Sequence, residues 1–472
     1  MNLMLNGLSK FITGFIDKIR GFILSTNRYT QTQRITFEFE KLRQTLDLIE
    51  YCQDSLPNLT TPRRFDRDSI RIGLSYNLMN NLYNLTQCLR RANIDAELVL
   101  WRGFDYLLTD DPRWETENVI LKEFTNKQLD LLNKSLPNSV REVPSKIAPL
   151  PQPVDTPFPR HLLEVAGYHL NNIDGYLSAM QDYDLLVVSG QAILIAPFTG
   201  KPYITFPYGA DLYESPFSND AFGKCILAGW RRANAHVLSG GNFFHYARIL
   251  GLQNCTYIPI LIDTDTYHPA KNITMREELL KRYDCERLFI APARHSWSYK
   301  GNEKIIEAVA QVARLDGGKR FKVIFNNWGE DLEKSRMLVT QKGLNEICVF
   351  IGAMSKKALH EYIRASDAVL DQFCLGEYGT LTLEAMSLAK PVILYYNWNN
   401  KIPVFNAFSI EEIAQQMVYI LDHPDEAAIA GRRGREWVVE NHGPGAVIPR
   451  FIKVFEAVLN GEMVPQFPRL ME

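Results

Sequence analysis

The residue types best suited to chemistry gather between positions 371 and 391, in the stretch DQFCLGEYGTLTLEAMSLAKP. Its pattern predicts the end of a strand, a loop with two glycines, a helix that begins at Gly379 and Thr380, and a further strand over 392–396. The first N–H groups of a helix have no partner inside it, and the helix dipole is positive at that end. The sequence therefore predicts an anion-binding position at Gly379 and Thr380.

Three polar residues of this predicted helix share one face, because Thr380, Glu384 and Ser387 are spaced at i, i+4 and i+7. A carboxylate one turn inside a helix that begins at a phosphate site is placed to bind the hydroxyl groups of a ribose. The alternative is an ordinary solvated helix face, and this stretch alone does not choose between the two.

Two cations, Arg294 and Lys300, lie in a predicted loop between the strand 288–291 and the helix 301–314. The guanidinium group is planar and can bind two oxygens at once, whereas the ammonium group is a mobile point charge. Together they suit a diphosphate. The alternative is two solvated loop charges.

The rest of the chain repeats a strand–helix–strand pattern. Short apolar runs alternate with segments of helical period, which indicates parallel sheets with helices on their faces. We therefore expect an α/β protein with two Rossmann-like domains. The predicted strands are 70–75, 96–100, 184–189, 202–206, 235–239 and 256–259 in the first half, and 288–291, 321–325, 348–351, 368–370 and 392–396 in the second.

The first half has polar residues after two predicted strands, at the edge where open α/β sheets bind ligands. Asn77 follows the first strand, and Tyr208 and Asp211 follow the strand 202–206. Asparagine is also an ordinary turn residue. The loop after the first strand lacks the GxGxxG pattern, so no dinucleotide cofactor is expected. Residues 109–159, rich in Asp, Asn and Pro, are predicted to form an insertion or a long loop.

The composition argues against several classes of partner. With 52 Lys and Arg against 54 Asp and Glu, the net charge of -2 gives no reason to expect a nucleic acid. The seven cysteines lack CxxC or Cys/His spacing, which argues for reduced thiols and against zinc. Asp263 and Asp265 are spaced as in a metal-binding Asp-x-Asp, but we interpret them as a turn at a domain junction, so no metal is expected.

Residues 1–24 are predicted to form a basic amphipathic helix, with Lys10, Lys18 and Arg20 opposite the apolar residues. Such a helix can lie in a membrane interface, which would make this a cytoplasmic protein, peripheral on the inner face of the membrane. The alternative is that the helix packs on the protein or on a second subunit of a homo-oligomer. No apolar stretch of about 18 residues occurs, so no membrane-spanning helix is expected.

Four segments, in this order, resemble the group 1 retaining glycosyltransferases of the glycosyltransferase-B fold. They are 207–211, 262–269, Arg294 with Lys300 and Gly301, and 383–386 with Lys390 and Pro391. The resemblance covers roughly residues 70 to 460. It implies two Rossmann-like domains that face each other across a cleft, a nucleotide-sugar donor held mainly by the second, and no required metal. The expected acceptor is a glycan or a lipid-linked molecule.

The resemblance also implies domain bounds and residue roles. Arg294 and Lys300 would neutralise the donor phosphates, and Glu384 would bind the ribose. The expected domains are a helical extension and linker over 1–65, an acceptor domain over 66–265, a donor domain over 266–440, and a helix over 441–472 that returns to the first domain. The expected site residues are Arg294, Lys300 and Glu377 for catalysis; Gly376, Tyr378, Gly379, Thr380, Leu381 and Glu384 for the donor; and Asn77, Tyr208 and Asp211 for the acceptor.

The sequence departs from the family pattern at two positions. The family usually has a glutamate eight positions before the ribose-binding one, but here that position is Gly376, and Glu377 follows it. Either Glu377 contacts the sugar or main-chain groups take that role. Tyr208 stands where a histidine is common.

Three functions are consistent with these features. The first is retaining transfer of a sugar from a nucleotide-sugar to an acceptor. The second is a nucleotide-sugar 2-epimerase, which shares the fold and needs additional acid–base residues. The third is a non-catalytic scaffold that binds a nucleotide-sugar. Incubation with candidate nucleotide-sugars distinguishes them, because the outcomes are transfer, interconversion or binding without turnover.

Overall fold

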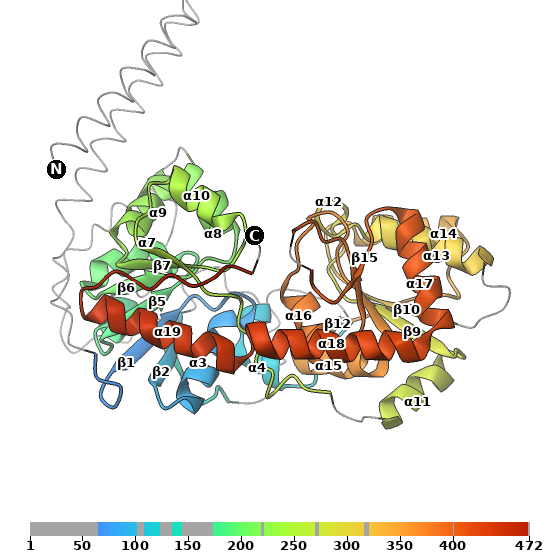
Figure 1. Ribbon diagram of the computed structural model, residues 1–472, viewed down its shortest axis with the longest axis horizontal. Coiled ribbons are helices and arrows are strands. Elements are labelled where there is room, and N and C mark those ends of the chain that lie inside the picture. The colour runs from blue at the N-terminus through green and yellow to red at the C-terminus, as the bar shows by residue number, and fades with distance from the viewer. Residues whose placement is uncertain are drawn as a thin grey trace, which may run out of the picture.

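The computed structural model describes residues 65–101, 108–122, 135–143, 173–218, 221–269, 273–315, 321–399 and 401–470. They form two lobes that lie side by side, each with a parallel sheet between layers of helices (Figure 1). The predicted α/β fold with two Rossmann-like domains is thereby confirmed. The helix predicted over 1–24 lies outside the described residues.

The first lobe is built on a seven-stranded sheet with the order β4-β2-β1-β5-β6-β7-β8. All six strand pairs are parallel, so the carboxyl ends of the strands share one edge. The direction of winding reverses between β1 and β5, which leaves a crevice at that edge. The strands are β1 (Arg71–Ser75), β2 (Asp95–Trp101), β4 (Val140–Val143), β5 (Leu185–Val188), β6 (Tyr203–Thr205), β7 (Ala235–Leu238) and β8 (Cys255–Tyr257).

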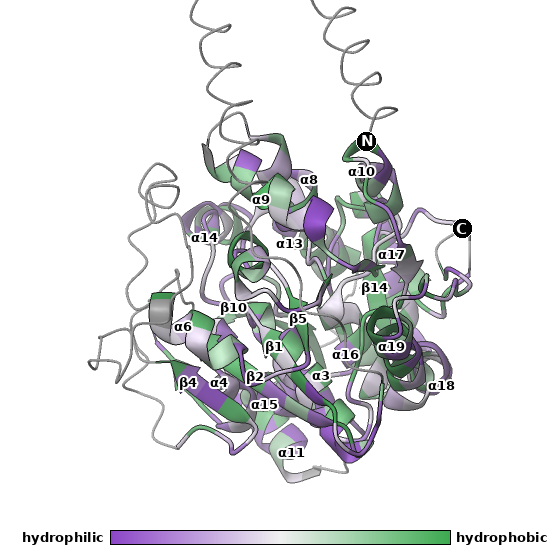
Figure 2. Cartoon of the chain, turned by 90° about the vertical axis from the view of Figure 1, so that its left-hand side faces the viewer, coloured by the Kyte–Doolittle hydropathy of each residue, from purple (hydrophilic) through white to green (hydrophobic). Residues whose placement is uncertain are grey.

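Alternating residues of the central strands form two cores, one on each face of this sheet, because successive side chains of a strand point to opposite faces. In β5, Leu185 and Val187 join one core, and Leu186 and Val188 join the other. Figure 2 shows this hydrophobic interior. The helices of this lobe are α3 (Asn81–Arg91), α6 (Ile173–Met180), α7 (Ala192–Ile195), α8 (Ala210–Tyr213), α9 (Ala221–Arg232) and α10 (Phe243–Ile249), with short 3-10 turns at Leu78–Asn80, Ala196–Thr199 and Ser215–Phe217.

The second lobe repeats the design with a six-stranded sheet of order β11-β10-β9-β13-β14-β15. Its winding reverses between β9 and β13, and all five strand pairs are parallel. The strands are β9 (Arg287–Ala291), β10 (Phe321–Asn326), β11 (Cys348–Ile351), β13 (Ala368–Leu370), β14 (Val392–Leu394) and β15 (Phe405–Asn406).

Local sequence signals set the helices of this lobe. The Ser355 hydroxyl caps α15, and Ser409 with Glu412 forms a capping box at the start of α17. The helices are α11 (Ile273–Arg282), α12 (Trp297–Lys300), α13 (Asn302–Leu315), α14 (Leu332–Gln341), α15 (Lys356–Ala365), α16 (Thr380–Ser387) and α17 (Ile410–Asp422).

Two C-terminal helices join the lobes. Helix α18 (Pro424–His442) runs along the second lobe, and α19 (Pro444–Leu459) runs along the first (Figure 1). At the junction, the N–H of Ile262 donates to the main-chain oxygen of His442 at 2.9 Å. Helix α19 buries Phe451 and Phe455 in the core of the first lobe, and each ring contributes about 2 kcal/mol by its removal from water.

A segment of the first lobe, residues 108–122, crosses to the second lobe, and we refer to it as the strap. It contains a 3-10 turn (Leu108–Asp110), α4 (Pro112–Thr116) and β3 (Ile120–Leu121). Strand β3 pairs antiparallel with β12 (Ala353–Met354) of the second lobe. The prediction of a long loop over 109–159 is therefore wrong for the strap and for β4, because pairing with distant strands orders these short segments.

Next to the strap, Ser355 fastens the second lobe to the first. Its hydroxyl donates to the main-chain oxygen of Glu117 at 2.6 Å and accepts from the N–H of Val119 at 3.0 Å. A Cβ at Gly352 would lie 2.1 Å from the main-chain oxygen of Leu121, so this close approach requires glycine.

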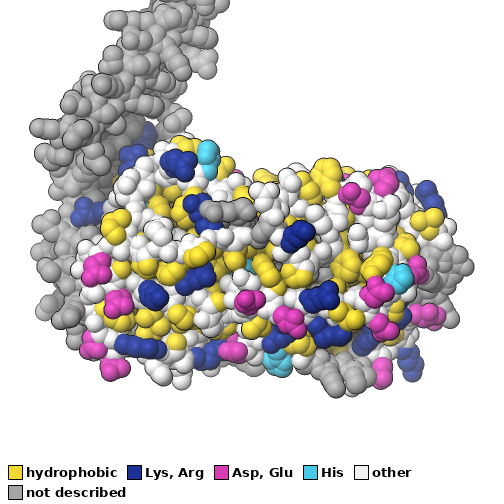
Figure 3. Space-filling model, in the orientation of Figure 1, with side chains coloured by type: hydrophobic (Ala, Val, Ile, Leu, Met, Phe, Trp, Pro, Cys, Tyr) yellow, Lys and Arg dark blue, Asp and Glu magenta, His cyan; other side chains and the backbone are white. Residues whose placement is uncertain are grey.

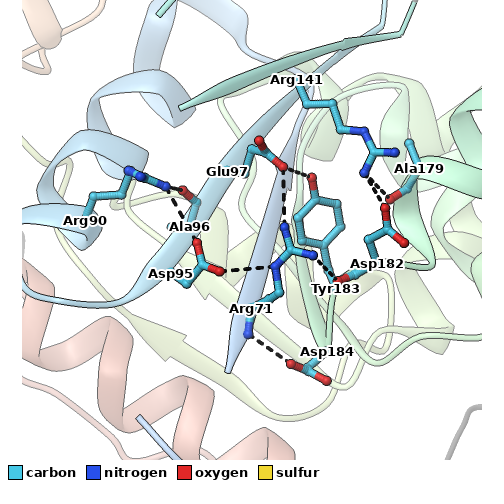
Figure 4. Close-up of polar contacts among 10 residues, drawn as sticks. All are labelled: Arg71, Arg90, Asp95, Ala96, Glu97, Arg141, Ala179, Asp182, Tyr183 and Asp184. Carbon is cyan, nitrogen blue, oxygen red and sulfur yellow. Dashed lines mark hydrogen bonds and ion pairs between the residues drawn. The ribbon is translucent and has the colours of Figure 1, made fainter. Parts of the chain in front are cut away.

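The amino ends of β1 and β2 carry a polar network, away from the crevice edge (Figure 4). The Arg71 Nε lies 3.1 Å from Asp95 Oδ2, and the Tyr183 hydroxyl donates to Glu97 Oε2 at 2.5 Å. A Cβ at Gly73 would lie 2.6 Å from the Tyr183 ring, so glycine lets this ring lie flat on the strand. The Arg71–Asp95 pair is about half exposed, which limits its contribution to about 0–1 kcal/mol.

The surface shows charges of both signs interspersed on the face that α18 and α19 cross (Figure 3). Among the residues that the structure describes, no helix combines the length and the hydropathy needed to cross a bilayer.

Candidate functional site

The second lobe places its chemically active residues at the crevice between β9 and β13. Arg294 and Lys300 follow β9, and the loop 371–379 follows β13. Both segments leave the carboxyl ends of parallel strands, at the point where the strand order reverses, so they meet at one edge of the sheet. This is the position that the sequence predicted for an anion site.

Lys300 lies against the segment that follows β13. Its Nζ donates to Gln372 Oε1 at 3.1 Å, and its main-chain oxygen accepts from the N–H of Phe373 at 3.0 Å. Arg294 is 44% exposed, and its guanidinium group lies 3.9 Å from Glu330. The structure therefore joins Lys300 to the loop directly, whereas Arg294 lies at the rim of the crevice.

Gly376, at the position of the family's first glutamate, has a backbone conformation that favours glycine. Its φ of +71° lies in the left-handed region, where side chains are strained. A Cβ here would also lie 3.1 Å from the Tyr395 ring and 3.2 Å from Asn397 Cβ. The main-chain oxygen of Gly376 accepts from the N–H of Asn397 at 2.9 Å, which holds the loop in this shape.

Gly379 begins α16 with an open N-terminus. No side chain caps this helix, and a Cβ built on Gly379 would meet nothing within 4 Å. Thr380 and Leu381 follow it and are partly exposed. No side chain therefore accepts from the first N–H groups of α16, and the start of this helix is partly exposed beside the loop that contacts Lys300.

Glu377 reaches across to the first lobe. Its Oε1 accepts from Asn242 Nδ2 at 3.0 Å, and burial raises the pKa of its carboxyl group. Nearby, a Cβ at Gly241 would lie 2.4 Å from the Trp398 ring, so the two lobes touch here as well as at the strap. A carboxyl group is thus present at the boundary of the lobes beside the loop.

The Tyr378 side chain packs in the core. It is 5% exposed, its ring stacks on Tyr396 with the centroids 5.8 Å apart, and its hydroxyl lies 3.3 Å from His442 Nε2. The ring therefore ties the loop to the end of α18, and a donor contact at Tyr378, which the main chain could make, stays a prediction.

Glu384 is not on an open polar face. It is 1% exposed, and its two carboxylate oxygens lie 2.5 Å from Lys356 Nζ and 3.2 Å from His360 Nε2, both on α15. Ser387, on the same face, is also buried. Because α15 covers this side of α16, the interpretation as a solvated helix face is wrong. The ribose contact by Glu384 stays a prediction.

The charges around Glu384 decide its protonation. Burial raises its pKa, but Lys356 and His360 outweigh burial and hold the pKa at about 2. For Lys356, burial lowers the pKa, but Glu384 and Glu115 outweigh it, so the pKa lies above its ordinary value. Burial lowers the pKa of His360 despite Glu384. At neutral pH the cluster therefore contains ionised Glu384, charged Lys356 and neutral His360.

Glu115, on α4 of the strap, completes this cluster from the first lobe. Both of its carboxyl oxygens are buried. Burial raises its pKa to about 8, with Lys356 acting in the opposite direction and Glu384 in the same direction. The two lobes thus meet at a buried site with two carboxyl groups and one ammonium group.

Replacing Glu115 with glutamine is expected to change how stability depends on pH. The folded-state pKa lies above the unfolded value of 4.5, so the folded wild-type protein loses stability as the pH rises from 4.5 to about 8. The Glu115→Gln variant lacks this loss, and its free energy of unfolding should exceed that of the wild type by about 4–5 kcal/mol at pH 9, fall to within about 1 kcal/mol of it at pH 5, and match it below pH 4.5.

Urea denaturation at these pH values measures the difference. Glu214→Gln, on the exposed surface of the same lobe, serves as the control and should leave the profile unchanged. If the free energy of unfolding depended on pH in the same way in the wild type and in Glu115→Gln, the raised pKa of Glu115 would be contradicted.

In the first lobe, Asn77 has a structural role. It is 4% exposed, its amide donates to Asn80 Oδ1 and to the main-chain oxygen of Asp110, each at 2.7 Å, and it accepts from the N–H of Tyr83 at 2.8 Å. These contacts satisfy its amide and hold the start of the strap. An acceptor contact by Asn77 stays a prediction.

Tyr208 and Asp211 also turn inward. The hydroxyl of Tyr208 is buried, and the carboxylate of Asp211 accepts from the main-chain N–H groups of Gly190, Tyr208 and Gly209 at 2.9–3.0 Å. The Asp211 carboxylate therefore orders the loop after β6. An acceptor contact by Tyr208 or Asp211 stays a prediction.

The loop after β1 is the strained part of the first lobe. Tyr76, Met79 and Asn80 have φ values of +74°, +50° and +60°. Each such conformation costs on the order of 1–3 kcal/mol, and such strain concentrates at functional sites. The loop follows β1 at the crevice edge, and it contains Asn77, which the sequence predicted as an acceptor contact.

Asp263 lies in a turn, as the sequence predicted. It is 4% exposed, and its carboxylate contacts the Arg91 guanidinium at 2.6 Å and the Thr266 hydroxyl at 2.7 Å. Within the part of the chain that the structure describes, no three His, Cys, Asp or Glu side chains gather as a metal site would require.

Sequence reasoning missed four residues of this region, Gln372, Asn242, Lys356 and Glu115. Gln372 sits in the stretch that the sequence singled out, and its place directly after a predicted strand was an available signal. The other three come from segments distant in the chain, and nothing local marked them.

This architecture is found in solved structures of glycosyltransferase-B proteins. HepE of Anabaena, in complex with UDP and glucose, aligns with a TM-score of 0.58 at 13% identity, over 81% of this chain and 98% of that one. Sucrose-phosphate synthase of Thermosynechococcus elongatus aligns with a TM-score of 0.57 at 14% identity, over 83% and 100% of the respective chains. The fold is therefore glycosyltransferase-B.

The sequence of the second lobe resembles a known family. Residues 277–437 match the family model for glycosyl transferases group 1. This range contains Arg294, Lys300, the loop 371–379 and Glu384.

Curated relatives match a similar share of the chain. A GDP-mannose-dependent alpha-(1-6)-phosphatidylinositol monomannoside mannosyltransferase of Mycobacterium tuberculosis is 26% identical over 202 residues, 39% of this chain and 50% of that protein. A 2-deoxystreptamine glucosyltransferase of Streptomyces kanamyceticus is 26% identical over 171 residues, 34% and 44% of the respective chains. The chain thus spans about half of the length of these relatives, or less.

Proposed function

We propose that this protein is a glycosyltransferase that moves a sugar from a nucleotide-sugar donor to an acceptor with retention of the anomeric configuration. The observation that carries the proposal is the open, uncapped N-terminus of α16 above Gly379, next to the loop that contacts Lys300. The family of residues 277–437 supports it. The nucleoside diphosphate part of the donor would lie in this crevice.

The chemistry follows from where charge develops. Cleavage of a glycosyl–phosphate bond places negative charge on the leaving diphosphate. The Lys300 ammonium, the Arg294 guanidinium and the N–H groups of α16 stabilise that charge more in the transition state than in the ground state, which accelerates the reaction.

For retention, the acceptor approaches on the same face as the leaving group, and a phosphate oxygen of the leaving group takes the proton from the acceptor hydroxyl. This route needs no pair of carboxylates of the hydrolase kind. Glu377, at the boundary of the lobes, is then not needed as a nucleophile, and it would contact the sugar by exchanging its hydrogen bond from Asn242.

A panel of nucleotide-sugars tests the proposal. Binding of the correct donor raises the melting temperature, because a ligand that binds only the folded state stabilises it. Slow donor hydrolysis, or transfer to an added acceptor with retained configuration, supports glycosyl transfer. Interconversion of the sugar indicates a 2-epimerase, and binding without turnover indicates a scaffold; either outcome contradicts the proposal.

We further propose that the acceptor is a lipid-linked or surface glycan and that residues 1–24 hold the protein on the inner face of the membrane. Removing residues 1–24 should shift the protein from anionic lipid vesicles to the supernatant in a sedimentation assay and leave its melting temperature unchanged. Replacement of Lys10, Lys18 and Arg20 by glutamine should have a smaller effect in the same direction. Undiminished sedimentation of the shortened chain would reject the anchor.

A further inference from the structure

One buried side chain connects the two parts of the proposed donor site. Gln372 follows β13 and is 3% exposed. Its Oε1 accepts from Lys300 Nζ at 3.1 Å, and its Nε2 donates to the main-chain oxygen of Glu377. Its own main-chain oxygen accepts from the N–H of Tyr395 at 2.8 Å, which fixes the backbone at this point.

The two partners determine the orientation of this carboxamide. An ammonium group only donates and a carbonyl oxygen only accepts, so the amide oxygen must face Lys300 and the amide nitrogen must face the loop. Glutamate at this position would set an acceptor against the carbonyl of Glu377, and leucine would satisfy neither partner. The site therefore uses both functions of a glutamine.

The neighbouring residue secures the other end of the loop. Successive residues of an extended segment point to opposite sides, so Asp371 and Gln372 reach different partners. The Thr382 hydroxyl in the first turn of α16 donates to Asp371 Oδ2 at 2.5 Å. Asp371 thus holds the start of α16, while Gln372 holds Lys300 and the middle of the loop.

We propose that Gln372 is a positioning residue. It keeps the Lys300 ammonium beside the N-terminus of α16, so that both contact the same diphosphate. The proposal rests on the proposed function. One hydrogen bond to Gln372 leaves two N–H groups of Lys300 for phosphate oxygens. A lysine side chain has several rotamers, and holding it in place before the donor binds removes an ordering cost.

A double-mutant cycle tests this inference. The variants are Gln372→Leu, Lys300→Ala and the two combined, and the measurements are the affinities for inorganic pyrophosphate, UDP and GDP, by calorimetry, together with kcat and KM. Gln372→Leu should weaken diphosphate binding and lower kcat by about 10-fold or more, the effect of losing a hydrogen bond to a charged group. In the Lys300→Ala background the same change should have almost no further effect, because Gln372 acts through Lys300.

Two further variants sharpen the result. Gln372→Glu keeps the size of the side chain, yet it should weaken diphosphate binding too, because its carboxylate competes with the phosphates for Lys300. Gln181→Leu is the matched control, since it removes an amide-to-carbonyl hydrogen bond of 2.8 Å, to Thr199 in the first lobe, and should change neither affinity nor kcat.

The outcomes separate this inference from the proposed function. A wild-type protein that binds none of the three diphosphates overturns both. If the wild-type protein binds them, two results overturn the positioning role alone. The first is an unchanged diphosphate affinity in Gln372→Leu. The second is an equal loss of affinity from Gln372→Leu whether residue 300 is lysine or alanine. Melting temperatures measured without ligand identify a variant that fails to fold, in which case Gln372→Glu decides the question.

Discussion

Replacement of Lys300 with alanine is expected to lower turnover by on the order of 10²-fold or more, with a similar loss for Arg294→Ala, as is typical when an oriented charge partner is removed from a transition state. Lys300 is held beside the α16 loop by Gln372, so the charge it supplies has a fixed place. Steady-state kinetics with the donor found by the panel measures kcat and KM. We expect the larger effect on kcat, because the charge on the leaving diphosphate is greatest in the transition state.

Lys342→Ala is the matched control for this prediction. Lys342 lies in the same lobe and pairs with Glu307 at 2.7 Å at a site where both side chains are 30% exposed. Its loss should leave kcat within about 2-fold of the wild type, since it contacts no part of the crevice. Unchanged turnover in both Lys300→Ala and Arg294→Ala would reject the proposal that these two residues bind the donor diphosphate.

Replacement of Lys356 with methionine is expected to cost about 3–5 kcal/mol of the free energy of unfolding at pH 8, the range for removing one partner of a buried ion pair. The side chains of Lys356 and Glu384 are only 11% and 1% exposed, and Glu115 lies close by. Without the ammonium group, two buried carboxyl groups face each other with no compensating charge. Urea denaturation measures the loss.

The loss of stability in Lys356→Met should become smaller as the pH falls. In the wild type, the depressed pKa of Glu384, about 2, contributes stability that is present above 4.5 and lost as the pH falls from 4.5 to 2. In Lys356→Met, burial dominates and the carboxyl groups take up protons at higher pH, which relieves the cost. The difference from the wild type should therefore be smaller at pH 5 than at pH 8.

An exposed lysine provides the comparison. Lys334 pairs with Asp331 at 2.6 Å, but its side chain is 61% exposed, so Lys334→Met should cost at most about 1 kcal/mol at either pH. An equally small loss for Lys356→Met would mean that the interlobe cluster is hydrated and contributes little to stability.

This cluster also bears on donor binding. Glu384 is engaged with α15, and the strap reaches the same place from the first lobe through Glu115. A ribose contact by Glu384, which stays a prediction, requires that carboxylate to exchange Lys356 for a ligand.

The sequence by itself determined the elements of the second lobe closely. The strand predicted over 321–325 is β10 at Phe321–Asn326, and the helix predicted over 301–314 is α13 at Asn302–Leu315. These signals are local, because buried parallel strands are short apolar runs and amphipathic helices repeat with their own period. The position of Lys300 and Gly379 at one edge of a parallel sheet followed from the same local signals.

Only the tertiary structure decided which of these residues are accessible. The spacing of Thr380, Glu384 and Ser387 gave one helix face, but whether water, a ligand or another helix covers that face depends on α15 and on the strap of the other lobe. The orientation of Gln372 likewise depends on Lys300, which lies 72 residues away in the chain. Contacts between distant segments leave no periodic trace in a single sequence. The sequence therefore identified Lys300 and Glu384, whereas their partners Gln372 and Lys356 became evident only from the packing.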